Sequence, residues 1–303
     1  MNQLPMTPEQ HDVAVFHPCP VDPDCPYCSR TLNVKSDAAF DWSFLDGAYC
    51  ISLKSRDDRA ASAAAQFHRI GLCRHVLFYR PIKHPNSVKH GIWDSHRAVG
   101  EHARQRGCAR TLIMEDDVLF SRRLRPRKVR AIAQALDSLP PDWMVFFLGH
   151  WPLWAYFVRP NVLRTGSACA HAYIASSRLV QWLHDHPYGA PDVQKAPRIV
   201  GAGIDAAYAR LEAAYALFPM IAIQSASKSD NMRYNPEKKK RKLRHLIRRS
   251  KHREWLLSNL MRPNELFIVM LSPLFFALRS SLQLSRHFVV RAERPSSRPR
   301  REQ

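Results

Sequence analysis

Three consecutive carboxylic acids, Glu115, Asp116 and Asp117, stand between the apolar runs 111–114 and 118–120. Carboxylates are rarely found beside buried segments unless a cation or hydrogen-bond donors compensate their charge. Hard divalent cations such as Mg²⁺ and Mn²⁺ take oxygen ligands, commonly one or two carboxylates together with phosphate oxygens of a substrate. The triplet is therefore a candidate seat for a metal–diphosphate complex. The alternative is a surface turn with solvated acids.

Four softer ligands lie close together near the N-terminus: Cys25 and Cys28, with His17 and Cys19 a few residues before them. A Cys-x-x-Cys pair and two further ligands are sufficient for a tetrahedral zinc site. No second ligand pair follows at the usual spacing, however, so the sequence favours reduced thiols without a metal.

Several common catalytic signatures are absent from the sequence. It has no Gly-x4-Gly-Lys-Ser/Thr phosphate loop, no Gly-x-Ser-x-Gly nucleophile elbow and no His-Glu-x-x-His zinc helix. Residues 201–206 match the dinucleotide-binding pattern, but only the short apolar stretch 198–200 precedes them, and no acid follows at the spacing of about 20 residues. A dinucleotide site is not expected there.

The apolar pattern around these residues predicts alternating strands and helices. Strands are expected at 47–53, 75–79, 111–114, 143–148, 170–174 and 215–223, and helices at 57–70, 88–106, 126–139, 177–186 and 205–214. Such alternation indicates an α/β domain with a mostly parallel sheet. Because ligands bind beyond the carboxyl ends of strands in such sheets, the acidic triplet lies where a ligand is expected.

The positive charge of the chain is concentrated in its C-terminal part. The chain carries 46 Lys and Arg against 26 Asp and Glu, a net charge of +20. Residues 238–303 hold 18 of those bases and 4 of the acids, so this segment contributes +14 and residues 1–237 contribute +6. Few aromatic residues are interleaved with the bases, and the rest of the chain is only mildly basic, so we expect no nucleic-acid partner.

Within the basic segment, the 13-residue apolar block 266–278 stands between clusters of Lys and Arg. It is shorter than the roughly 20 residues of a spanning helix, but long enough to lie in the interface of an anionic membrane. The alternative is a core helix followed by a solvated tail. No secretory signal is visible in the first 16 residues. We therefore expect a cytoplasmic protein, peripheral on the inner face of the membrane.

Short blocks across residues 47–231 resemble, in the same order, the family 25 glycosyltransferases, which include lipooligosaccharide galactosyltransferases and relatives of collagen galactosyltransferase. The block 112–118, Leu-Ile-Met-Glu-Asp-Asp-Val, is similar to the family's Leu-Glu-Asp-Asp-Val core. In the block 91–96, Ile92 replaces a usual Cys, and the tryptophan expected soon after it is absent. The other blocks are 49–54 with Arg56 and Arg59, 147–149, 172–174 with Ser176, 204–205 and 216–230.

The resemblance implies a nucleotide-sugar-binding, Rossmann-like glycosyltransferase domain of the A type over residues 47–237. An irregular extension, 1–46, precedes this domain, and a basic, amphipathic membrane-surface tail, 238–303, follows it. The implied activity is transfer of a sugar, such as galactose, from a UDP-sugar to a glycan or lipid-linked glycan acceptor, for example lipooligosaccharide. Transfer occurs with inversion and requires Mn²⁺ or Mg²⁺.

The resemblance also implies roles for single residues. The expected metal ligands are Asp117 and Glu115, and the expected donor-binding residues are Ser52, Arg59, His96 and Asp116. Inversion needs a base for the acceptor hydroxyl. Asp205 is the candidate, although an acid at a helix start is also favoured by the helix dipole alone. The alternative function is a catalytically inactive family member that acts as a membrane-associated binding or scaffold protein.

Overall fold

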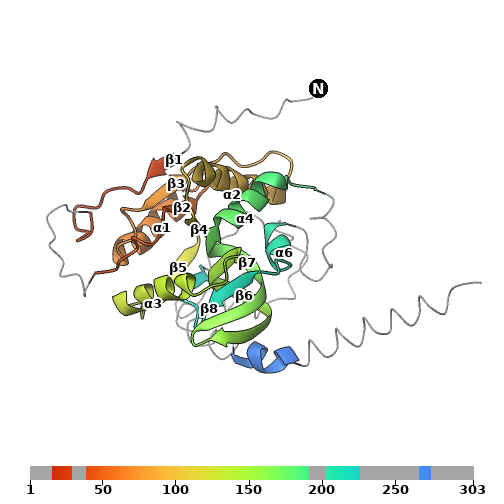
Figure 1. Cartoon of the computed structure of the whole chain (residues 1–303). Helices are drawn as coiled ribbons and strands as arrows, with labels where there is room; N and C mark the ends of the chain where they lie inside the picture. The colour runs from red at the N-terminus through yellow and green to blue at the C-terminus, as the bar shows by residue number, and fades with distance from the viewer. Residues whose placement is uncertain (1–15, 29–38, 191–202, 226–265, 274–303) are drawn as a thin grey trace, which may run out of the picture.

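The computed structural model of the chain describes residues 16–28, 39–190, 203–225 and 266–273 (Figure 1). Its strands are β1 (Phe16–Pro18), β2 (Gly47–Ile51), β3 (Val76–Tyr79), β4 (Arg110–Glu115), β5 (Val118–Phe120), β6 (Val145–Arg159), β7 (Val162–Ser176), β8 (Ala214–Leu217) and β9 (Ala222–Gln224). Its helices are α1 (Asp57–Arg69), α2 (Val88–Gln105), α3 (Pro126–Asp137), α4 (Ser177–Asp185) and α6 (Ile204–Tyr208). Residues 266–273 are also helical.

Seven strands form one sheet in the order β1-β3-β2-β4-β7-β6-β8, and β5 pairs with β9 in a separate antiparallel ribbon. Strands β3, β2, β4, β6 and β8 run in one direction, whereas β1 and β7 run against them. The structure thus confirms a mixed α/β architecture with a mostly parallel central sheet.

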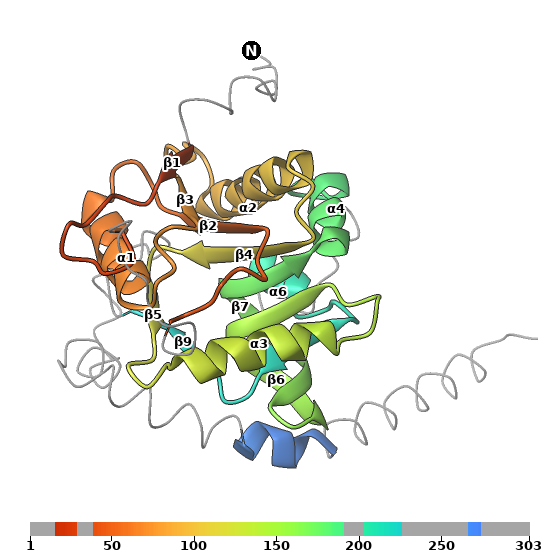
Figure 2. The ribbon, with the colours of Figure 1, turned by 60° about the vertical axis from the view of Figure 1, so that its left-hand side comes forward.

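Apolar side chains leave both faces of the sheet, so each face supports its own core. In β4, Leu112 and Met114 belong to the cluster that includes α1 and α3, whereas Ile113 belongs to the cluster that includes α2, α4 and α6. Figures 1 and 2 show the corresponding layers of helices on either side of the strands. Burial on both faces explains why β2 and β4 are near-continuous apolar runs rather than alternating ones.

The helices begin where local chemistry favours a start. Ser87 precedes α2 and accepts a hydrogen bond from the backbone N–H of His90 at 3.2 Å. Ser176 does the same for α4 through Leu179 at 3.3 Å, and Pro126 occupies the first turn of α3. The two serines thus provide acceptors for N–H groups that have no partner within the helix, and Pro126 has no N–H group to satisfy.

The segment predicted as an irregular extension contributes to the core where the structure describes it. Strand β1 pairs with β3 at the edge of the sheet. Trp42 is 1% exposed, and its indole N–H donates to the carbonyl of Ile70 at 2.9 Å. A three-residue strand is too short to show a period in the sequence, which is why it was not predicted.

Strands β6 and β7 are 15 residues each, much longer than the predicted strands 143–148 and 170–174. Their pairing contains several register shifts, which interrupt the alternation of side chains that would mark one long strand. One of these shifts lies at Gly149. A Cβ atom there would overlap the carbonyl oxygen of Ala222 and the ring of His171, so the close approach of β9 requires glycine.

Residues 266–273, the described part of the predicted apolar block, pack against the β6–β7 hairpin. The Ser272 hydroxyl accepts a hydrogen bond from the backbone N–H of Ala155 at 2.8 Å and donates to the carbonyl of Ile268 at 2.8 Å. Val269 packs against the core of the α/β unit. The rest of the block and both basic clusters lie outside the described residues. No helix in the described ranges has the length and apolar character needed to cross a membrane.

Candidate functional site

The acidic triplet lies at the carboxyl end of β4, in the turn that leads to β5. Glu115 is the last residue of β4 and lies beside Ile51, the last residue of β2. The backbone N–H of Asp116 donates to the carbonyl of Ile51 at 3.1 Å, and the carbonyl of Asp117 accepts from Ser225 at 2.6 Å. Backbone hydrogen bonds therefore fix the turn from two sides. The turn lies at the edge of the sheet where the sequence predicts that a ligand binds.

Arg59, in the first turn of α1, forms ion pairs with two of these acids. Its guanidinium lies 2.8 Å from Asp116 and 2.7 Å from Asp117. The three side chains are 13%, 6% and 14% exposed, so the charges are largely removed from water. The structure shows that Arg59 bridges the two acids, and its predicted role in donor binding stays a prediction.

The environment raises the pKa of all three acids. Burial is the largest cause in each case. The pKa of Glu115 rises to about 8, with repulsion from Asp205 and Asp116 adding to burial. The pKa of Asp116 rises to about 6 and that of Asp117 to about 7, although Arg59 opposes both shifts. One guanidinium in direct contact is thus insufficient to compensate this group of acids, and an additional cation would stabilise their ionised forms.

His96 lies on the other side of Glu115, with its Nε2 atom 3.7 Å from a Glu115 carboxylate oxygen. Its Nδ1 is 2.8 Å from the Tyr173 hydroxyl, which in turn is 2.8 Å from the Tyr208 hydroxyl. Burial lowers the pKa of His96 to about 4, so the ring is neutral at pH 7. A series of hydrogen bonds thus runs from Tyr208 in α6 through Tyr173 in β7 to His96 in α2. The Nε2 atom of His96, at the end of this series, is buried near Glu115 without a hydrogen-bond partner among the described residues.

Asp205, in the first turn of α6, belongs to the same group. One of its carboxylate oxygens accepts the backbone N–H of Ala170 at 2.9 Å, which attaches α6 to β7. Although the residue is exposed, desolvation by the surrounding protein raises its pKa, and its charge acts on both Glu115 and His96. The structure therefore brings this acid close to the triplet, whereas its role as a base stays a prediction.

Ser52 completes the predicted set at the carboxyl end of β2. It is 1% exposed, and its backbone N–H donates to the carbonyl of Tyr79 at 2.9 Å. Its hydroxyl lies beside Asp116 and acts to lower the pKa of that acid. The predicted site residues thus form one group, linked by ion pairs, hydrogen bonds and electrostatic interactions. They are Ser52, Arg59, His96, Glu115, Asp116, Asp117 and Asp205.

The acids fit a divalent cation that a substrate helps to hold, rather than a closed protein cage. Among the described residues, two groups of possible metal ligands have all their ligand atoms within 4.8 Å of one another, and neither group includes the triplet. The carboxylates of the triplet therefore do not converge on one point. However, the Oδ1 atom of Asp117 is buried without a hydrogen-bond partner in the described part of the chain. Mg²⁺ and Mn²⁺ commonly bind one or two carboxylates and complete their coordination with substrate phosphates and water. Asp117 and Glu115 supply carboxylates of this kind, and binding of Mn²⁺ or Mg²⁺ by them stays a prediction.

Three further residues contribute to the site without having been predicted. Tyr173 and Tyr208 fix the ring of His96, and their hydroxyls gave no signal in the sequence beyond apolar patterning. Cys169 has a backbone φ of 90°, a conformation that non-glycine residues rarely adopt, and its thiol is close enough for Asp205, Glu115 and Asp117 to raise its pKa. Such strain is seen at functional sites, but only coordinates reveal it.

A scan of protein-family models finds none that matches this chain, and a search of curated proteins finds no relative.

Proposed function

We propose that this protein is a metal-dependent glycosyltransferase that moves a sugar, such as galactose, from a UDP-sugar to a glycan or lipid-linked glycan, for example lipooligosaccharide, with inversion. The observation that supports it best is a group of four acids at the carboxyl edge of a mostly parallel sheet, of which Asp116 is buried, Glu115 and Asp117 are partly buried and Asp205 is exposed. Their raised pKa values, despite the ion pairs with the Arg59 guanidinium, are what a site that gains from a divalent cation and a diphosphate would have. A Rossmann-like domain of the A type is the finer fold that accompanies this proposal.

In this proposal Asp117 and Glu115 hold Mn²⁺ or Mg²⁺. The bound cation neutralises the charge that develops on the departing nucleoside diphosphate. Asp116 stays paired with Arg59 and orients that guanidinium toward the donor, while Ser52 lines the end of β2. His96 offers its Nε2 atom, the one polar ring atom that Tyr173 does not occupy, to the donor or the acceptor.

Asp205 is the base of the proposed reaction. Inversion in one step requires a group that takes the proton of the acceptor hydroxyl as the new glycosidic bond forms. The backbone N–H of Ala170 holds one carboxylate oxygen of Asp205, which fixes the orientation of the side chain. Its raised pKa increases its basicity toward that of an effective general base.

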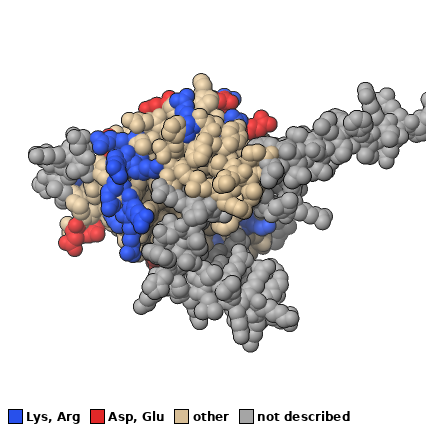
Figure 3. Space-filling model, turned by 90° about the horizontal axis from the view of Figure 1, so that it is seen from below, with Lys and Arg blue, Asp and Glu red and all other residues tan. Residues whose placement is uncertain are grey.

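We also propose that the protein lies on an anionic membrane surface, as a cytoplasmic, peripheral protein of the inner face. Exposed apolar side chains cluster on the β6–β7 hairpin and on the helix 266–273 that packs against it. They are Trp151, Tyr156, Phe157, Val158, Leu266, Phe267, Met270 and Leu271. Figure 3 shows a band of Lys and Arg on the side where Figure 1 places α1 and α3. Exposed apolar groups and cations both contribute to the binding of peripheral proteins to anionic lipid.

The proposed activity is tested by incubating the full chain with a panel of nucleotide sugars, with Mn²⁺, with Mg²⁺ or with a chelator. Release of the free nucleotide is measured, with and without glycan acceptors. We expect release from a UDP-sugar only with metal, and a loss on the order of 10²-fold or more for Asp117→Asn, since the variant lacks a ligand of the leaving-group metal.

Asp137→Asn is the matched control, because Asp137 is an exposed acid at the end of α3 whose ion pair with Arg110 lies on the surface. The control should retain full activity. If the protein binds UDP and Mn²⁺ but releases no free nucleotide from any nucleotide sugar, the proposed enzymatic activity is contradicted and the inactive scaffold is supported. Full activity of Asp117→Asn with unchanged metal dependence would contradict the assignment of the site.

A further inference from the structure

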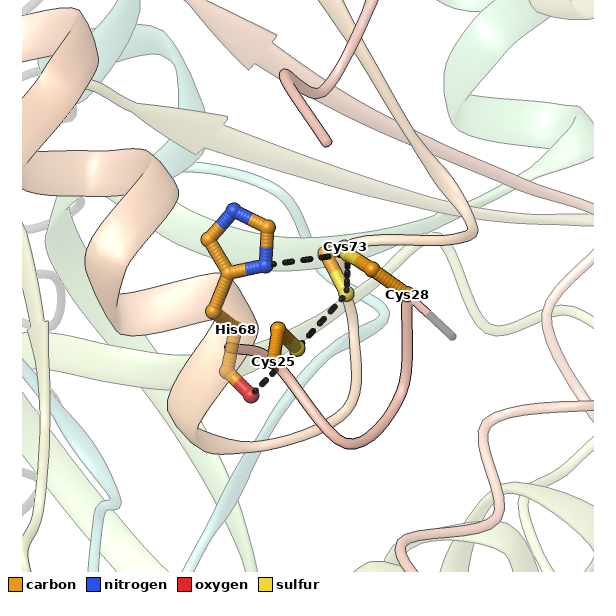
Figure 4. A group of neighbouring side chains, drawn as sticks. All are labelled: Cys25, Cys28, His68 and Cys73. Carbon is orange, nitrogen blue, oxygen red and sulfur yellow. Dashed lines mark hydrogen bonds between the residues drawn. The ribbon is translucent and has the colours of Figure 1, made fainter. Parts of the chain in front are cut away.

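Three cysteines and one histidine meet at the C-terminal end of α1 (Figure 4). They are Cys25, Cys28, His68 and Cys73, and one ligand atom from each lies within 4.8 Å of the other three. Cys25 and Cys73 are 4% and 5% exposed, so the group is shielded from water on one side. None of the four contacts the acidic group, and the proposed function uses none of them.

Two turns of the backbone bring these residues together. The Cys-x-x-Cys segment is a tight turn, in which the backbone N–H of Cys28 donates to the carbonyl of Cys25 at 3.1 Å. Helix α1 ends in a Schellman arrangement, because the N–H of Leu72 donates to the carbonyl of Phe67 at 2.9 Å around Gly71, whose φ is 66°.

The Schellman turn has a direct consequence for the ligands. It reverses the chain and returns Cys73 beside His68, so that these two residues form a second ligand pair five positions apart. The ring of Tyr27 lies against Gly71, where an added Cβ would be 3.0 Å from two ring atoms. The two turns are thus packed on each other, and each presents one pair of ligands.

We propose that Cys25, Cys28, His68 and Cys73 bind one zinc ion. The Sγ atom of Cys28 lies 3.5 Å from that of Cys73 and 3.3 Å from Nδ1 of His68, and the Sγ atoms of Cys25 and Cys73 are 3.9 Å apart. In a tetrahedral site with Zn–S of about 2.3 Å and Zn–N of about 2.0–2.1 Å, two sulfurs are separated by about 3.8 Å and a sulfur and a nitrogen by about 3.6 Å. The measured separations are close to those edges.

Other uses of these thiols fit the geometry less well. A disulfide requires sulfurs about 2.05 Å apart, and the pairs here are separated by 3.5 and 3.9 Å. Mg²⁺ and Mn²⁺ favour oxygen ligands, so this set is too soft for the cation proposed at the acids. Three thiolates and one imidazole form a closed, four-ligand set without an open position, which is the pattern of a structural zinc site rather than a catalytic one.

The zinc would cross-link the N-terminal segment to the end of α1. Residues 16–28 also join the domain through β1, a strand of three residues at the edge of the sheet, and through the contact of Tyr27 with Gly71. The site would also anchor the C-terminal end of α1, whose first turn carries Arg59. His68 lies nine positions after Arg59, about 14 Å along a helix, so the two proposed metal sites are distinct.

This ligand set differs from the one that the sequence offered. His17 and Cys19, which the sequence offered as candidate partners of Cys25 and Cys28 while favouring reduced thiols, are not in the group. His17 is exposed on β1, and the backbone N–H of Cys19 donates to the carbonyl of Val76 at 3.0 Å. The true partners lie 40 residues or more further along the chain, which is why their spacing was not recognised.

The first test measures the metal in the full-length wild-type protein, purified under reducing conditions. Elemental analysis should find one zinc per chain. X-ray absorption at the zinc edge should give three sulfurs at about 2.3 Å and one nitrogen at about 2.0–2.1 Å. Absence of zinc even after incubation with the metal, oxygen-dominated coordination, or a disulfide between any two of these cysteines would overturn the proposal. This measurement needs no variant, so a folding defect cannot obscure it.

The second test uses variants to assign the ligands. Cys28→Ser should lower zinc affinity by on the order of 10²-fold or more, since a thiolate ligand is lost. His17→Ala and Cys19→Ala should keep one zinc, because the structure places neither residue in the group, and Cys108→Ser controls for loss of a buried thiol elsewhere. If His17→Ala or Cys19→Ala loses the metal while Cys28→Ser retains it, the assigned site is wrong.

Discussion

Arg59 offers the sharpest test of the acidic site, because it contacts two acids that have little access to water. Arg59→Met removes the guanidinium while keeping an unbranched side chain with a high helix propensity in the first turn of α1. The variant leaves Asp116 and Asp117 buried without the cation that now lies 2.8 and 2.7 Å from them. We therefore expect a loss of stability that depends on whether another cation is present.

The size of this loss follows from the burial of the pair. Removing one partner of a buried ion pair costs about 3–5 kcal/mol in free energy of unfolding. The lower limit applies here, because the raised pKa values of Asp116 and Asp117, about 6 and about 7, allow the acids to take up protons. About 3 kcal/mol corresponds to a fall in Tm of about 6–12 °C for a domain of this size.

The assay is thermal unfolding of the full chain in chelator and in Mn²⁺. A divalent cation replaces part of the missing positive charge, so Mn²⁺ should raise the Tm of Arg59→Met more than that of the wild type. Metal at 100 times its Kd adds about 2.7 kcal/mol, enough to offset most of the loss. The control is Arg104→Met, which breaks an exposed pair with Glu101 on α2 and should cost about 0.5 kcal/mol or less. The reasoning is refuted if both variants lose equal stability in chelator, or if Mn²⁺ stabilises wild type and Arg59→Met equally.

Two further predictions concern the base and the membrane. Asp205→Asn should lower turnover by about 10²- to 10⁴-fold while calorimetry shows unchanged UDP binding; equal losses of both would show that Asp205 positions the nucleotide instead. Phe267→Ser combined with Met270→Ser should lower sedimentation with anionic vesicles by at least about 10-fold, since each apolar side chain contributes on the order of 1 kcal/mol. Ile82→Ser, an equally exposed position on the loop before α2, should leave sedimentation unchanged, and equal binding by all three proteins would contradict the proposed membrane face.

The sequence could predict the acidic site because its main signals are local. A buried apolar run followed directly by Glu115, Asp116 and Asp117 places the acids at the carboxyl end of a strand, and the parallel topology brings the end of β2 to the same edge. Arg59 was suggested by the family resemblance, whereas Asp205 follows from a helix start, whose position is also local. For such residues, secondary structure and chain direction suffice to predict proximity.

Other features depend on contacts that no local pattern records. The register shifts of β6 and β7 hide a long hairpin behind interrupted alternation. The hydrogen bonds from Tyr208 through Tyr173 to His96 join three elements through hydroxyl groups that look like ordinary core aromatics. The pairing of Cys28 with Cys73 requires the helix end at Gly71 to be known first, since only the reversal of the chain there places the second ligand pair.

The two proposed metal sites have opposite chemistry and share one helix. The acids that follow β4, beside the start of α1, offer hard oxygen ligands in an incomplete shell, which suits a cation that exchanges with its substrate. The thiolates at its end offer a soft, complete shell, which suits a cation that stays. A strong chelator removes both, so loss of activity in chelator does not by itself locate the catalytic metal. The variants Asp117→Asn and Cys28→Ser distinguish the roles of the two sites. Asp117→Asn should abolish turnover while the protein retains its zinc. Cys28→Ser should lower the stability of the protein, and should lower activity only where the position of α1 is lost.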